Sequence, residues 1–133
     1  MKQFAHSRVS TLLRRMAAQV KQTAETGGEE SVHDLRVAIR RLSRALRVFA
    51  QFFPGKAWKR IRKELSQLMD AAAAVRDSDV ALELLDKAGV AERARVVLAL
   101  QARRRKAEGE LREELQAWRQ RGFARQWREA LEL

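Results

Sequence analysis

The stretch SVHDLRVAIRRLSRALRVFAQFF, from Ser31 to Phe53, decides the fold expected for this chain. Its apolar residues recur at alternating intervals of three and four, the spacing that lines up one face of an α-helix. The pattern continues for about six turns without a glycine or a proline. We therefore predict one long amphipathic helix, with a buried stripe made of Val32, Leu35, Ile39, Leu42, Leu46, Phe49 and Phe53.

The residues on either side of this stretch are typical of helix ends. Gly27–Gly28 ends a preceding helix, and Ser31 is a good N-cap. Asp34 follows three residues later, where an acid can reach back to the cap and meet the positive end of the helix. Pro54-Gly55 then predicts a turn, because proline disfavours helix at the residue before it and glycine permits positive φ.

The rest of the chain also favours helix, since its 133 residues include 6 glycines and 1 proline. The polar run Arg76-Asp77-Ser78-Asp79 has the acids and the hydroxyl expected at a helix start, so it predicts a break. Short connections predict an all-α, antiparallel four-helix bundle with an extra short helix, forming one domain over residues 1–133. The remaining helices are expected at about Lys2–Glu25, Lys56–Val75, Val80–Ala88 and Ala91–Arg121, with a short segment through Trp127 and Leu131.

The positive charge of the chain is confined to its first half. Residues 1–63 hold fifteen Lys and Arg against four Asp and Glu, which accounts for the whole net charge of +11, while residues 64–133 hold thirteen of each. Arg outnumbers Lys three to one, and the planar guanidinium suits phosphate oxygens. Such crowding of like charge costs stability unless a partner neutralises it, so we expect a polyanionic partner.

Much of this excess lies on one face of the helix Ser31–Phe53. At about 100° per residue, one sector of about 80° contains a histidine and four arginines and no acid. These residues are His33, Arg36, Arg40, Arg44 and Arg47. Lys56, Lys59 and Lys63 on the next helix, and Arg8 and Arg15 on the first, are candidates to extend the positive surface.

Two structural explanations of this arginine face stay open. It could be a solvated helix face, or acids of neighbouring helices, Asp77 and Asp79 first among them, could neutralise it. The run Arg103–Lys106 lies in mid-helix and points in several directions, so we interpret it as facing solvent.

Catalysis, cofactors and metals are not expected. His33-Asp34 resembles part of a metal-dependent phosphohydrolase site, but His6 is the only other histidine and there is no cysteine. No phosphate-binding glycine loop and no catalytic triad motif is present, so we expect a protein that is not an enzyme. No apolar stretch approaches 18 residues, so we expect no membrane span, and a cytoplasmic location.

Two segments resemble the conserved histidine α-helical domain, or CHAD, family. The first is Val32–Leu42, VHDLRVAIRRL, continuing through Arg44, Leu46, Arg47 and Phe49. The second is Ala74–Val80, AVRDSDV, followed by Leu84-Leu85. The two segments occur in the family's order and spacing.

This resemblance implies a domain of two related four-helix bundles facing each other across a basic channel, which binds inorganic polyphosphate without turning it over. The family's histidine falls on His33, and its acidic pair on Asp77 and Asp79, which we assign to capping and arginine positioning. The chain has about half the usual length of the family's domain and no second His-and-Arg helix, so we expect a homodimer that rebuilds the channel. The family's basic positions fall on Arg36, Arg40, Arg41, Arg44 and Arg47.

Two other functions remain open beside polyphosphate binding. RNA or DNA would also meet the arginines, although nucleic-acid surfaces often add exposed aromatics and the Trp and Phe residues here mostly occupy core-like positions. A scaffold or assembly module is the third possibility. It predicts that acids from other helices cover the arginine face.

Overall fold

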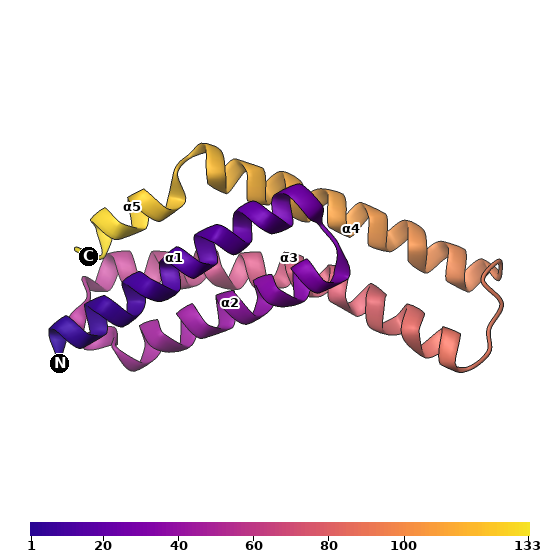
Figure 1. Cartoon of the computed structure of the whole chain (residues 1–133), viewed down its shortest axis with the longest axis horizontal. Helices are drawn as coiled ribbons and strands as arrows, with labels where there is room; N and C mark the ends of the chain where they lie inside the picture. The colour runs from indigo at the N-terminus through magenta and orange to yellow at the C-terminus, as the bar shows by residue number, and fades with distance from the viewer.

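The computed structural model describes residues 1–133 and is built of helices alone (Figure 1). This confirms the all-α prediction. None of the helices has the length and hydropathy needed to span a lipid bilayer. The elements in chain order are α1 (Lys2–Thr26), α2 (Glu29–Val48), the 3₁₀ turn η1 (Ala50–Phe52), α3 (Gly55–Lys87), α4 (Arg95–Gln120) and α5 (Phe123–Ala130).

The helices form the predicted antiparallel bundle. The predicted short helix Val80–Ala88 is instead the end of α3, and α5 forms in the predicted last segment through Trp127. α1 and α2 lie against the first half of α3 and the second half of α4, and both chain termini lie at the same end (Figure 1). α5 is fixed by two hydrogen bonds: Arg128 donates to Ser10 Oγ (2.9 Å) and Trp127 Nε1 donates to the Glu64 carboxylate (3.1 Å). A single cluster of 24 buried residues, drawn from α1 to α5, forms the core.

The turn between α1 and α2 is held by α4. Gly27 ends α1 with φ of 61°, and a side chain at this position would collide with Glu108 and Arg112 of α4. Arg112 donates to the carbonyl oxygens of Ala24 (3.0 Å) and Glu25 (2.9 Å), which have no partner within α1. The positive φ favours glycine at residue 27, and any larger residue would also have to displace the Glu108 and Arg112 side chains.

The expected start of the second helix at Ser31 is wrong. α2 begins at Glu29, with Gly28 as its N-cap residue, so Asp34 lies beyond the first turn. The Ser31 hydroxyl is instead buried between α1 and α2, 2.8 Å from the Thr23 hydroxyl. A tertiary hydrogen bond thus replaces the expected local cap.

The expected break at Arg76–Asp79 is also wrong, because α3 runs unbroken through it. The polar groups that could have capped a new helix have other partners. Ser78 donates to the Ala74 carbonyl oxygen (3.4 Å), and the buried Asp79 accepts from Arg104 of α4, which also pairs with Glu108. Arg104 is therefore not the solvated residue that we predicted, although Arg103, Arg105 and Lys106 are exposed.

The second half of α3 and the first half of α4 continue past the turn between α1 and α2 (Figure 1). They form an antiparallel hairpin that no other helix covers in this view. α4 begins at Arg95 rather than at Ala91, after a turn over residues 88–94.

Candidate anion-binding surface

The apolar stripe of α2 is fully inside the bundle, which fixes the direction of its arginines. Val32, Leu35, Ile39, Leu42 and Leu46 are each at most 1% exposed. Because the basic residues occupy another sector of the same helix, they remain at the surface. His33, Arg40, Arg41, Arg44 and Arg47 are exposed and Arg36 is half-buried.

No acid neutralises this surface. The chain has eight ion pairs, and none involves any of the fifteen Lys and Arg of residues 1–63. Asp79 pairs with Arg104, and the exposed Asp77 has no ion-pair partner. The explanation in which neighbouring acids cover the arginines is therefore wrong. All eight pairs are made by Arg76, Arg104, Arg112, Arg119, Arg121 and Arg125.

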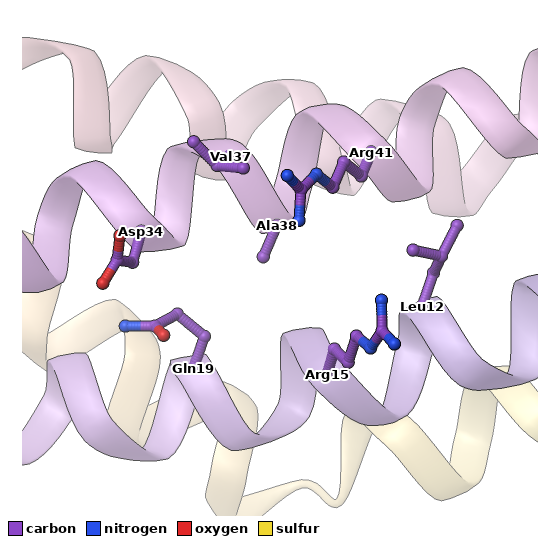
Figure 2. Close-up of a pocket in the computed structure, with 7 residues that line it drawn as sticks. All are labelled: Leu12, Arg15, Gln19, Asp34, Val37, Ala38 and Arg41. Atoms are coloured by element: carbon purple, nitrogen blue, oxygen red, sulfur yellow. The ribbon is translucent and has the colours of Figure 1, made fainter.

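One flank of the surface is a basic groove between α1 and α2. Arg15 of α1 and Arg41 of α2 project into the same hollow of about 200 Å³, with Asp34 and Gln19 at its other end (Figure 2). Arg15 of α1 thus extends the positive surface of α2, as its position in the sequence had suggested.

A second hollow of about 390 Å³ continues this groove toward the end of α2. Arg8, Arg41 and Arg44 lie around an apolar floor that includes Phe49. Phe4 lies edge-on to Phe49, 5.8 Å between ring centroids, and remains 59% exposed. The expectation that the aromatic residues are mostly buried does not hold for Phe4.

The other flank of α2 faces α3. Trp58 Nε1 donates to the Leu46 carbonyl oxygen, and the Arg62 guanidinium lies over the Trp58 ring, 5.0 Å from its centroid. The Nε atoms of Arg36 and Arg62 are buried and have no hydrogen-bond partner. Arg62 was not among the predicted site residues, although its spacing of four residues from Trp58 indicates that the two side chains share one side of α3.

His33 lies at the acidic end of α2. It shares an open hollow of about 410 Å³ with Arg76 and the glutamates Glu29, Glu30 and Glu83. The pKa of Glu29 is raised above its ordinary value of 4.5, chiefly because its side chain shares a hydrogen bond with Glu83. Partial burial and the charges of Asp79 and Glu83 raise this pKa further, and Arg76 opposes them. The surroundings of His33 are therefore acidic, unlike those of the α2 arginines, and an anion bound there would meet three glutamates.

The two histidines do not converge. The ring of His6 stacks on Phe53, 4.9 Å between centroids, and its Nε2 lies 3.2 Å from the Phe52 carbonyl oxygen. His6 therefore fixes the turn after α2. No set of three or more His, Asp or Glu side chains in the chain is arranged to hold a metal ion.

Residues 7–133 of the chain match the family model of the CHAD domain. The chain belongs to the CHAD domain family. No curated protein and no solved structure matches it significantly.

The two CHAD segments lie on adjacent helices. The first is α2 itself, and the second, Ala74–Val80, is the part of α3 that passes the start of α2. Arg76 of this second segment reaches Glu29 of α2 at 3.2 Å, and Asp79 holds Arg104. Asp79 thus positions Arg104, which is not one of the predicted anion-binding arginines, and neither Asp77 nor Asp79 caps a helix.

The three lysines of α3 that were expected to extend the positive surface do not lie beside the α2 arginines. Lys56, Lys59 and Lys63 are exposed on α3, but they lie about 100–160° around that helix from Trp58, which faces α2. The structure therefore brings together Arg8, Arg15, Arg41 and Arg44 in the α1 groove. Arg36, Arg40, Arg47 and Arg62 lie toward α3, and the lysines lie apart.

Proposed function

We propose that this CHAD domain binds inorganic polyphosphate along the outer face of α2, without catalysing its turnover. The observation that carries the proposal is the absence of any ion pair from the fifteen Lys and Arg of residues 1–63. Acids are available elsewhere in the fold and pair with other arginines. A flexible polyanion would supply the charge that the protein itself does not.

The spacing of the cations suits a repeating anion. Arg36, Arg40, Arg44 and Arg47 follow one another at steps of about 4.5–6 Å along the helix axis. Each guanidinium offers a planar fork of donors to phosphate oxygens. Arg8 and Arg15 add donors from the facing wall of the α1 groove, so the ligand would be held from two sides.

The acids mark where the ligand would end. Glu29, Glu30 and Glu83 surround His33 at the start of α2. We therefore infer that polyphosphate runs from Arg36 toward Arg47 and the Arg8 hollow. His33 would then donate only at the edge of the site, or when the nearby carboxyl groups are protonated.

Charge reversal tests this function. We expect Arg40→Glu with Arg44→Glu to abolish polyphosphate binding in isothermal titration while leaving the helical circular dichroism unchanged. The matched control, Arg103→Glu with Arg105→Glu, changes the same charge on exposed residues of α4 and should retain most of the affinity. Equal losses in the two variants would mean that net charge, rather than α2, determines binding.

The non-catalytic part of the proposal has its own test. Polyphosphate incubated with the protein and divalent cations should keep its chain length on a gel. Shortened chains that depend on the α2 arginines would contradict it.

Nucleic acid remains a second candidate because of Phe4. This exposed aromatic ring lies beside Arg8 and Arg44, and an aromatic surface among cations is what single-stranded RNA or DNA uses for base stacking. Competition at equal phosphate concentration separates the two ligands. We expect polyphosphate to displace RNA, and Phe4→Ala to leave polyphosphate affinity unchanged; the opposite results favour nucleic acid.

A further inference from the structure

The part of the α3–α4 pair that extends past the bundle, residues 79–106, carries unusually exposed apolar residues. We call it the projecting hairpin. The whole chain has six exposed large hydrophobic residues, and Leu84, Val96 and Leu98 of this segment are half of them. Leu84 is 61% exposed and Leu98 is 49% exposed. Apolar residues gathered on a segment without a neighbour indicate a contact surface.

The uncovered side of the hairpin continues the core of the bundle. Leu98 and Arg105 precede Arg112 at intervals of seven residues, so all three lie on one side of α4. Arg112 uses that side to reach the end of α1. Beyond this contact the same side has nothing against it, as Figure 1 shows. On α3, Arg76 reaches Glu29 of α2, and Val80 lies one turn later on the same side of the helix.

A groove lies between the two hairpin helices. It has a volume of about 190 Å³ and an apolar floor that includes Leu82, Val90 and Val97, with Asp86 and Glu92 among its walls. Val97 is 7% exposed although no helix other than α3 lies nearby, so the hairpin already has a small core of its own.

The two arms of the hairpin have opposite charge. Asp79 and Arg104 neutralise each other within the chain. The remaining acidic arm, residues 80–87, has two acids and one lysine, for a net charge of −1. The basic arm, residues 93–106, has five other Lys and Arg and no acid. When two identical hairpins pack around a two-fold axis, the acidic arm of each can lie against the basic arm of the other. The surface is thus complementary to itself.

We propose that the projecting hairpin docks on the hairpin of a second copy of this chain, through the side that carries Leu84 and Leu98. Contact between two α2 faces, the arrangement first expected for a homodimer, would bring two unneutralised arginine surfaces together and is opposed by their repulsion. The proposal does not depend on polyphosphate binding, because it uses different residues. About ten residues of each helix would contribute to the contact. The area buried would then be near roughly 1,200 Å², the lower limit for specific interfaces, so we expect a dissociation constant in the micromolar range.

Sedimentation equilibrium of the full chain from about 1 to 100 µM tests the proposal, and we expect a monomer–dimer transition in this range. Leu84→Gln with Leu98→Gln should weaken the dimer about tenfold or more, since exposed leucines would form the centre of the contact. Val96→Gln is the matched control. Val96 is as exposed as Leu98, at 49%, but shares the opposite side of α4 with Arg103, and this variant should dimerise normally.

Mixing two charge variants tests the pairing of the arms. Glu83→Lys with Asp86→Lys makes both arms positive. Reversing four arginines of the other arm to Glu (Arg93, Arg95, Arg103 and Arg105) makes both arms negative, so that in the mixture each arm meets one of opposite charge. Each variant alone should be monomeric at 50 µM, and an equimolar mixture should dimerise, which also shows that both variants fold. A monomeric wild-type chain, or a mixture that stays monomeric, would overturn the proposal. Polyphosphate affinity, measured in parallel, should not change in the Leu84 and Leu98 variant.

Discussion

Arg15 of α1 and Arg41 of α2 project into one hollow from opposite helices, and neither forms an ion pair (Figure 2). Asp34 lies at the other end of this hollow and pairs with neither arginine, so the two cations repel each other across the α1–α2 groove. A surface of this kind is expected where a ligand supplies the negative charge.

Removing one of these charges should affect stability and binding in opposite directions. We expect Arg15→Gln to raise the free energy of unfolding by a few tenths of a kcal/mol, because like-charge repulsion is relieved. The same variant should bind polyphosphate more weakly. Urea denaturation and isothermal titration measure the two effects, and a loss of both stability and affinity would mean that Arg15 has a structural role.

Salt should weaken polyphosphate binding steeply. Each arginine that contacts phosphate releases counterions, so log K should fall linearly with log salt, by roughly 0.7 per contact for a single-stranded polyanion. Arg44→Gln with Arg47→Gln should reduce the slope by about 1.4. The exposed pair Arg103→Gln with Arg105→Gln should leave the slope near its original value, and a slope that no α2 variant changes would contradict the proposed contacts.

The Asp79–Arg104 pair should be essential to stability. The Asp79 side chain is 7% exposed and that of Arg104 is 19% exposed, so Arg104→Ala would leave a carboxylate buried without a partner. We expect a loss of about 3–5 kcal/mol in the free energy of unfolding. Arg125→Ala is the control, since the exposed Arg125–Glu129 pair should contribute less than about 1 kcal/mol.

The raised pKa of Glu29 predicts a pH effect at the start of α2. The folded protein holds this proton more tightly than the unfolded chain does, because Glu29 shares a hydrogen bond with Glu83. The unfolded chain therefore loses it first as pH rises, so stability from this group is lost between the ordinary value of 4.5 and the raised value. Glu83→Gln should lower the Glu29 pKa in an NMR titration and remove this loss. An unchanged titration would show that the two carboxyl groups are not coupled.

Repeating patterns predicted most of the fold. The spacing of Val32, Leu35 and Ile39 alone fixed the buried side of α2, and hence the exposure of its arginines, because helix geometry links the two. Gly27 was correctly expected to end α1, since its positive φ is a local property.

Long-range partners account for what could not be predicted. Ser31 and Asp79 both resemble helix caps, but their side chains bond to Thr23 and Arg104 instead. Arg104 is 25 residues from Asp79 in sequence, and no local pattern indicates such a pairing. In the same way, charge counting placed the lysines of α3 with the arginines of α2, whereas the rotation of α3 set by Trp58 separates them.

Chemical-shift mapping of the ¹⁵N-labelled chain during titration with polyphosphate tests the central claim most directly. We predict that the perturbed residues gather on α2 from Arg36 to Arg47 and on the facing side of α1 at Arg8 and Arg15. The exposed basic residues of α4, Arg103, Arg105 and Lys106, serve as the internal comparison. Perturbations centred on α4, or spread evenly over all cations, would contradict a polyphosphate site on α2.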